Sequence, residues 1–434
     1  MKQASGVTES EIVAYVGLDW ADQEHVICLQ ERGRTKKELS RVSNRPEELQ
    51  AWVAQLQQRF GTGKVAIALE QSRGAVVHAL MGYGFLQLYI IPPSCLASYR
   101  KAFRISGAKD DPRDAELLLD LLGRHPDRFQ AWEPDTVPTR ALQLQTQYRR
   151  RLVDKRTQLT NEITSLLKNY FPQALDWAGD LTTLQTCKFL QRFPTLQAVQ
   201  KAKPDVLRRF YARRGCRRKQ VVERRLQQIR QAQPLTQDRA VIESMSLMVQ
   251  SLAAILQACT EAVQELDKQI GEQFEQHPDR GIYESLPGAG QALAPRLLTA
   301  LGSDRNRFET AQQIQQMSGI APVTVTSGKS HRVHWRWACP KFMRQTFHEH
   351  ARHSLKSCLW ARAVYEQKRQ QGKGHNAAVR VVAYKWIRII FRCWNDQVPY
   401  DENTYLLTLQ RRNPSLIAAI ERLQASAADK KAVA

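Results

Sequence analysis

Four carboxylate side chains in the first third of the chain have the residue types and positions of a metal site. Asp19 ends one apolar segment, YVGL, and Glu70 ends a second, VAIAL. Asp111 and Asp114 lie in GAKDDPRDAELL, where a helix is expected to begin. Carboxylate oxygens suit Mg²⁺ or Mn²⁺, and two such ions about 4 Å apart can activate a nucleophile and stabilise the leaving oxygen of a phosphodiester. The four acids therefore predict metal-dependent phosphodiester chemistry.

Each acid taken alone also has a structural interpretation. Asp111 has the position of a helix N-cap, with Pro112 at the first helical position and Asp114 one turn further on the same side. Asp110 is also one turn from Asp114, so helical geometry leaves the register of this pair open. Glu70 alone could be a solvated strand end.

The elements that must position these acids alternate between strand and helix from about residue 10 to 130. Apolar runs predict strands at 12–18, 25–29, 64–69 and 86–91, and helical spacing predicts helices at 46–60 and 76–81. The first two strands flank the polar turn WADQE, which predicts a hairpin. Strands with crossover helices indicate a three-layer α/β domain, in which ligands bind beyond the carboxyl ends of the strands.

The middle of the chain is predicted to be helical. Apolar residues recur at helical spacing over 142–167 and 241–274, which predicts two long amphipathic helices, antiparallel or coiled against a second copy. A helical insert between them carries a basic run with Phe210 and Tyr211 embedded in it. Such a run suits a phosphate backbone with unstacked bases, as in structured RNA, or is a solvated helix face. The candidate nucleic-acid contacts in it are Arg213, Arg214, Arg217, Arg218 and Lys219.

Two features of the last third could contact a phosphate. Gly288 and Gly290 lie in PGAG before an apolar helix, as in the hairpin of helix-hairpin-helix modules, or in a plain interhelical turn. The extended segment 321–336 carries Ser327 and Ser330 on either side of Gly328 and Lys329, with Arg332 nearby. A serine hydroxyl beside these cations could attack a phosphate, although an ordinary turn serine has the same appearance. Spacing alone does not choose between the two serines.

Composition sets limits on the class of protein. A length of 434 residues predicts two or three domains, and 43% hydrophobic residues are enough for their cores. The net charge of +22 favours a polyanionic partner, most simply nucleic acid, over a merely basic solvated surface. Eight scattered cysteines indicate reduced thiols, and neither a leader nor a spanning segment of about 20 apolar residues is evident. We therefore expect a cytoplasmic, nucleoid-associated protein.

Eight segments, read in order, resemble the bacterial insertion-sequence transposases of the one-ten family. They are GLDWADQEHVICL, ALEQSRG, SGAKDDPRDAELL, LPGAGQALAPRLL, FETAQQIQQMSGIAPVTVTSGKS, WACPKFMRQTFHEHA, GKGHNAAVRVVAYKWIRIIF and PYDE. The resemblance covers about 14–403. It implies a fold that is α/β plus all-α: a RuvC-like (RNase H) domain at 10–135, a coiled-coil region at 136–278 with its insert at about 175–238, and a C-terminal transposase domain at 279–415. Residues 416–434 are expected to form a flexible tail.

The resemblance also assigns roles to individual residues. It implies that Asp19, Glu70, Asp111 and Asp114 are the catalytic acids, within a Lys-x-Asp-x-x-Asp-Ala pattern that begins at Lys109, a candidate DNA contact. It singles out Ser327 as the nucleophile. Where many relatives have Glu-x-Thr-Gly, this chain has Glu70-Gln71-Ser72-Arg73-Gly74, one residue longer.

The implied activity is DNA transposition through a serine–DNA ester, with donor DNA, target DNA and a structured non-coding "bridge" RNA as partners. Base pairing would then supply specificity. Because Ser327 is over two hundred residues from the acids, the two must meet either within one chain or across a dimer. The coiled helices favour a homodimer, with a tetramer at synapsis. Two other classes fit part of the sequence. A RuvC-like Holliday-junction resolvase or nuclease needs the acids but no serine, and a non-catalytic nucleic-acid scaffold needs neither.

Overall fold

The computed structural model describes residues 11–103, 111–213, 219–328 and 330–432. The chain divides into two compact units, Met1–Pro134 and Asp135–Ala434. Each unit is described by itself below.

A six-stranded mixed sheet forms the centre of the first unit. Its order is β3-β2-β1-β4-β5-β6, with β1 antiparallel to β2 and parallel to β4. The strands are β1 Ile12–Asp19, β2 Glu24–Glu31, β3 Lys37–Ser43, β4 Lys64–Leu69, β5 Leu86–Ile90 and β6 Ala131–Trp132. The predicted β1–β2 hairpin and the predicted strands β4 and β5 are confirmed. Strands β3 and β6 were not predicted.

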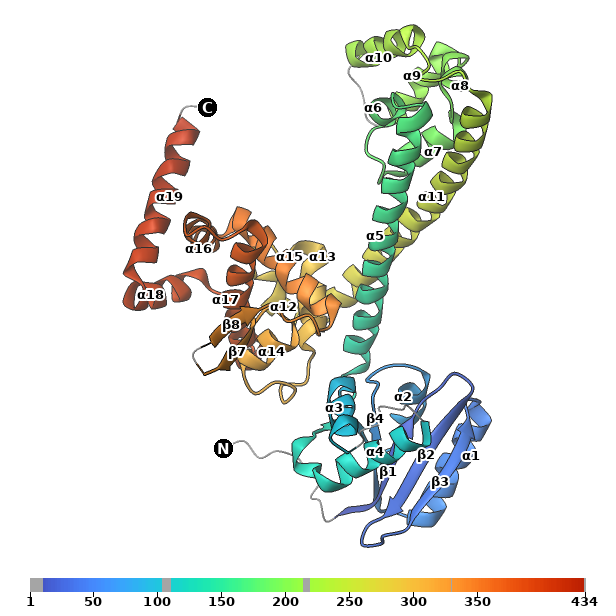
Figure 1. Ribbon diagram of the computed structural model, residues 1–434. Coiled ribbons are helices and arrows are strands. Elements are labelled where there is room, and N and C mark those ends of the chain that lie inside the picture. Colours follow the sequence, from blue (N-terminus) through green and yellow to red (C-terminus); the bar gives the residue numbers. More distant parts are fainter. Residues whose placement is uncertain (1–10, 104–110, 214–218, 329, 433–434) are drawn as a thin grey trace. The chain divides into compact units, whose positions relative to one another are not determined.

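Helices cover both faces of this sheet and give it three layers (Figure 1). On one face, α1 Pro46–Phe60 and α2 Ala75–Leu80 pack on the apolar residues of β1 and β4. On the other face, α4 Asp111–Arg124 packs on β1 and β4, next to α3 Pro93–Phe103. A 3₁₀ turn at Pro126–Arg128 leads to β6. This is the expected RNase H-like arrangement.

Two long antiparallel helices, α5 Val137–Tyr170 and α11 Arg239–Glu275, begin the second unit (Figure 1). Their direction follows from pairs such as Arg149 with Asp267, and from the Cys259 thiol, which donates to the carbonyl of Leu152 at 3.3 Å. Five shorter helices join them and form the insert. These are α6 Ala174–Ala178, α7 Leu184–Arg192, α8 Leu196–Gln200, α9 Pro204–Arg213 and α10 Lys219–Gln231.

Helix α11 has the length and apolar composition to cross a membrane, with a mean hydropathy of 1.4 over its most apolar window. The expectation that no segment approaches this composition was therefore too strong. The helix packs along α5 and α7 instead, and Val249, Leu256 and Val263 are buried there. It is a core helix of the second unit, and its composition is no evidence of a membrane span.

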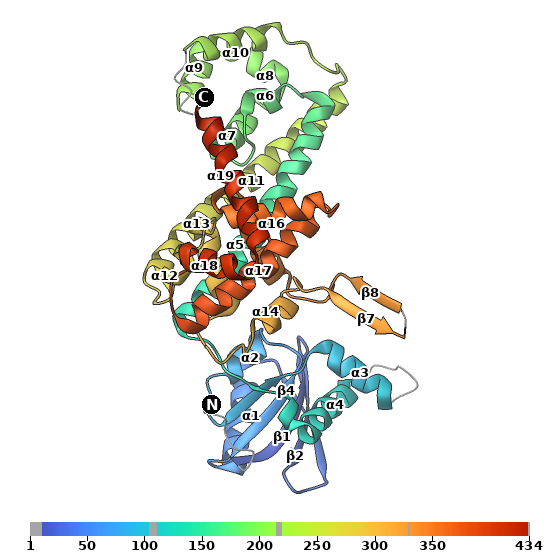
Figure 2. The ribbon, with the colours of Figure 1, turned by 90° about the vertical axis from the view of Figure 1, so that its left-hand side faces the viewer.

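The remaining helices surround a core that contains the buried indoles of Trp360, Trp386 and Trp394. An exposed two-stranded hairpin of β7 Val323–Ser327 and β8 Ser330–His334 extends from them (Figure 2). The helices are α12 Arg280–Glu284, α13 Gly290–Leu301, α14 Ala311–Met317, α15 Lys341–Ser357, α16 Leu359–Gln370, α17 His375–Asp396, α18 Glu402–Arg412 and α19 Pro414–Ala432. The segment expected to be a flexible tail is thus helical to Ala432, because Leu416 and Ile420 are buried in the core.

Candidate active site and nucleic-acid surfaces

Asp19 and Glu70 lie side by side at the carboxyl ends of neighbouring parallel strands. Asp19 is the last residue of β1, and Glu70 directly follows β4. Gly17 of β1 is paired with Ala68 of β4, and the same register brings Asp19 next to Glu70. Neighbouring strands of a sheet lie about 4.8 Å apart. Both side chains are half-buried. Two of the predicted acids therefore share one edge of the sheet.

Both acids face the side of the sheet that α4 covers. Side chains alternate along a strand, so Glu70 lies on the face of Ala66 and Ala68, which pack on Leu117 and Leu118 of α4. Asp19 likewise lies on the face of Gly17. A Cβ at Gly17 would come within 1.9 Å of the Ala115 carbonyl oxygen, so this glycine allows α4 to touch the strand.

The direction of α4 brings its first turn to the same corner. The strand pairing places Lys37 of β3 at the same height in the sheet as Tyr15 of β1. Lys37 forms an ion pair at 2.7 Å with Asp120, near the end of α4, so this end of the helix lies at the height of Tyr15. Two residues further along β1, Gly17 meets Ala115. Continuing in this direction, Asp19 is level with the first turn of α4, which carries Asp111 and Asp114. The fold thus brings the positions of all four predicted acids to one corner of the sheet.

Asp114 already has a cationic partner. Asp114 is 3% exposed, and its Oδ1 accepts a hydrogen bond from Nε of Arg100 of α3 at 2.9 Å. Nη2 of Arg100 forms an ion pair with the same oxygen at 2.7 Å. Arg100 is a site residue that the sequence analysis missed, because an arginine fourteen positions from its partner leaves no local pattern. Asp111, in contrast, is exposed.

The all-carboxylate donor set fits a hard divalent cation. Among the described residues, no three histidine, cysteine or acidic side chains form a preassembled metal cluster. The four acids therefore lie near one another without forming a complete set of metal ligands among the described residues. Arg100 neutralises the charge of the buried Asp114. Asp110 and Lys109 lie outside the described residues.

Ser327 lies at the tip of the β7–β8 hairpin, directly opposite Ser330. Both serines are exposed, as is Arg332, which is paired with Val325 two positions back along β7. Gly328 has φ +52° and makes the turn between the strands. Lys329 lies outside the described residues. The hairpin presents the predicted nucleophile to solvent.

The PGAG turn packs tightly against α15. Gly288 has φ +79°, and a Cβ there would meet the backbone nitrogen of Ser354 at 2.7 Å. Close helix packing is therefore sufficient to require this glycine. Gly290 is exposed with φ +54°, and nothing lies within 4 Å of its Cβ position. Of the two glycines, Gly290 is the one that a phosphate could approach.

The basic run of the insert differs from the expectation in its aromatic residues. Tyr211 is completely buried beneath Arg225, and Phe210 packs on Phe189 with ring centroids 5.4 Å apart. Both rings pack on the core of the insert, and the buried Tyr211 ring is not available to stack on bases. Arg213 and Lys219 are exposed, while Arg214, Arg217 and Arg218 lie outside the described residues.

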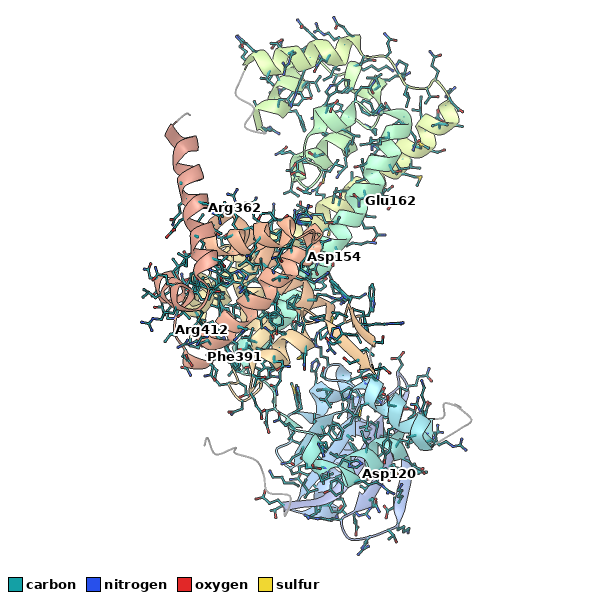
Figure 3. The ribbon with its side chains drawn as sticks, turned by 60° about the vertical axis from the view of Figure 1, so that its left-hand side comes forward. Asp120, Asp154, Glu162, Arg362, Phe391 and Arg412 are labelled. Atoms are coloured by element: carbon teal, nitrogen blue, oxygen red, sulfur yellow. The ribbon has the colours of Figure 1, made fainter. Side chains whose placement is uncertain are left out.

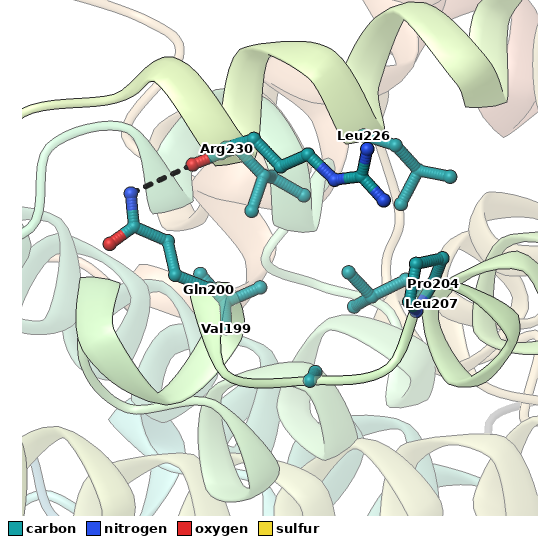
Figure 4. Close-up of a pocket in the computed structure, with 8 residues that line it drawn as sticks. Val199, Gln200, Pro204, Leu207, Leu226 and Arg230 are labelled. Carbon is teal, nitrogen blue, oxygen red and sulfur yellow. Dashed lines mark hydrogen bonds between the residues drawn. The ribbon is translucent and has the colours of Figure 1, made fainter.

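A small hollow of about 150 Å³ also lies within the insert (Figure 4). Its lining includes the aliphatic side chains of Leu207 and Leu226, and Gln200 closes one side by donating to the carbonyl of Ile229 at 2.9 Å. It is a packing gap, so exposed cations such as Arg213 remain the nucleic-acid candidates of the insert.

Two family models and several known proteins match the sequence of this chain. Residues 16–172 match a family model described as "Transposase", of the DEDD type whose acids use a divalent metal, and residues 281–366 match "Transposase IS116/IS110/IS902 family". The mini-circle protein for IS117 of Streptomyces coelicolor is 27% identical over 91% of this chain and 97% of its own length. The IS900 protein of Mycobacterium paratuberculosis is 24% identical over 90% and 98%. This chain therefore belongs to the IS110 family of transposases, enzymes that bind DNA and transfer its strands.

Proposed function

We propose that this transposase cuts and rejoins DNA through a covalent ester between Ser327 and a DNA phosphorus. The acids Asp19, Glu70, Asp111 and Asp114 would complete the site. The observation that carries the proposal is the exposed Ser327 hydroxyl at the end of β7, which, within the described chain, has no hydrogen bond to a general base. An isolated serine is a weak nucleophile. Its activation must therefore come from groups brought to it.

The chemistry conserves the phosphodiester energy. The Ser327 oxygen forms a bond to phosphorus as the bond to one sugar oxygen breaks; the serine proton leaves to a basic oxygen at the acid site, and the released sugar oxygen gains a proton. A hydroxyl of a second strand then attacks the ester and returns the proton to Ser327. Divalent ions, when bound by the acids, would supply positive charge that stabilises the transition state at phosphorus.

The acids and the serine belong to different units of the chain, so the proposed site is composite. A second copy is one way to complete it. The paired helices α5 and α11 support self-association because large apolar side chains on them are about half exposed or more: Leu144, Tyr148, Leu247, Met248 and Ile255. We propose a homodimer in solution and a tetramer at synapsis, in the bacterial cytoplasm near the nucleoid.

A guide RNA is the third part of the proposal. The net charge of +22 favours binding of a polyanion such as nucleic acid. The exposed cations of the insert, such as Arg213 and Lys219, suit a phosphate backbone. A bridge RNA bound there would select donor and target DNA by base pairing.

Covalent trapping tests the proposal. The full chain is incubated with Mg²⁺, a plasmid that carries the ends of its insertion element, and RNA transcribed from that element, and is then denatured. We expect a DNA–protein adduct that Ser327→Ala abolishes and that the matched Ser330→Ala retains. An adduct that survives Ser327→Ala contradicts the serine assignment. Cleavage without any adduct favours the RuvC-like nuclease instead.

A further inference from the structure

A basic hollow of about 530 Å³ lies at the base of the β7–β8 hairpin, between α5, α15 and α17. This volume is in the range of small-ligand sites. We call it the Trp335 pocket, and its aromatic, cationic and imidazole lining residues are Trp335, Lys341, Arg344, His348 and Arg380. Trp335 directly follows β8, so the hairpin and the pocket are continuous in the chain.

Two guanidinium groups are held on the same indole ring. The Cζ of Arg380 lies 3.7 Å from the centroid of Trp335, and that of Arg344 lies 5.3 Å from it. Burial and the nearby positive charge of Arg344 lower the pKa of Arg380. Two like charges in a half-buried site repel each other, and an anion between them removes that repulsion.

The nearby carboxylate is already engaged. Asp154, labelled in Figure 3, lines the pocket from α5 and is paired with Arg150. Within the described part of the chain, the Trp335 Nε1–H group is buried and has no hydrogen-bond acceptor. The pocket thus offers two guanidinium groups to an incoming group rich in oxygen.

An exposed aromatic face lies beside the pocket. Trp337 is 80% exposed, and its ring centroid is 6.3 Å from that of Trp335. Its carbonyl accepts a hydrogen bond from Arg344 at 3.5 Å, which places the cation beside this second indole. A phosphate site adjacent to an exposed indole is the combination by which proteins hold unpaired nucleotides.

We propose that the Trp335 pocket binds one unpaired nucleotide of a nucleic-acid strand, with its phosphate between Arg344 and Arg380 and its base on Trp337. The five residues of β8 separate this site from the hairpin tip by about 17 Å, or about five steps of a duplex strand. The pocket therefore holds a nucleotide away from the scissile phosphate. This inference goes beyond the proposed ester chemistry and does not depend on it.

The test measures binding of fluorescent 12-residue oligonucleotides to the full chain in a Ser327→Ala background, so that failure of the ester chemistry cannot affect the result. Single-stranded DNA, single-stranded RNA, the DNA duplex and an abasic DNA strand are titrated by anisotropy at several salt concentrations. Trp337→Ala should weaken binding of DNA or RNA single strands by about 5- to 150-fold, the effect of one lost base stack, and should leave the abasic strand unchanged.

The phosphate contacts are tested by salt dependence. Arg344→Gln and Arg380→Gln should each reduce the slope of log affinity against log salt by about 0.7 for single strands. Arg412→Gln, which removes an exposed charge from α18 of the same unit, should leave the slope unchanged. Unchanged affinity in Trp337→Ala overturns the proposal, as does an equal loss for the abasic strand or for the duplex. A loss confined to DNA or to RNA identifies the strand that occupies the pocket.

Discussion

Replacement of Gly17 by alanine tests whether contact between α4 and β1 builds the acid site. A Cβ at this position would lie 1.9 Å from the Ala115 carbonyl oxygen and 2.6 Å from the Leu119 nitrogen, and both are backbone atoms. Neither can rotate away, so α4 must move off the sheet. Overpacking usually costs about 1–3 kcal/mol, and a backbone clash belongs at the upper end. At about 4 °C per kcal/mol, the melting temperature of the first unit should fall by about 12 °C.

The same movement separates Asp111 and Asp114 from Asp19 and Glu70. Calorimetric titration with Mn²⁺ should therefore show at least tenfold weaker binding in Gly17→Ala. The matched control is Gly123→Ala, which lies in α4 with open space around its Cβ position. It should stabilise the helix by about 0.5–1 kcal/mol and leave Mn²⁺ binding intact. A Gly17→Ala protein that melts within 3 °C of the parent and binds Mn²⁺ equally well refutes the packing argument.

Three further predictions concern a buried ion pair, a buried histidine and an apolar helix face. Arg100→Gln leaves the Asp114 carboxylate buried without its cation and should lower the free energy of unfolding by about 3 kcal/mol, a loss that Mn²⁺ should partly restore. The control Arg128→Gln removes one partner of an exposed pair and should lower it by less than about 0.5 kcal/mol. Burial lowers the pKa of His350 to about 4. Since the unfolded chain takes up this proton below pH 6.5, stability should fall by up to about 3 kcal/mol between pH 6.5 and 4, and the pH–stability curve of His350→Leu should be flatter. Ile255→Glu should weaken self-association at least tenfold in sedimentation experiments, whereas an unchanged dimer would exclude this face of α11.

The central elements of the first unit follow from local sequence patterns. The apolar spacing of Leu49, Trp52 and Leu56 predicts α1, and the WADQE turn predicts the β1–β2 hairpin. Both elements can be predicted because each signal lies within a few residues of the chain. Strand β3 escaped prediction because its side chains are mostly exposed at the edge of the sheet, so KELSRVS has no apolar face.

Features that depend on tertiary contact could not be predicted. In the sequence, Gly17 looks like an ordinary strand residue, and only its close contact with α4 shows why glycine is required there. Phe210 and Tyr211 looked exposed because arginines flank them, yet both rings pack inward while the charged groups extend to solvent. The partnership of Arg100 with Asp114 joins two helices and is likewise invisible in the sequence.

Mass spectrometry of the trapped adduct identifies the residue that forms the ester with DNA. The denatured DNA–protein adduct is digested with nuclease and protease, and the peptide that retains a nucleotide is sequenced by fragmentation. We expect a nucleotide mass on Ser327, in the peptide that contains VTVTS. A nucleotide on Ser330 or on any other residue, or cleaved DNA with no modified peptide, would contradict it.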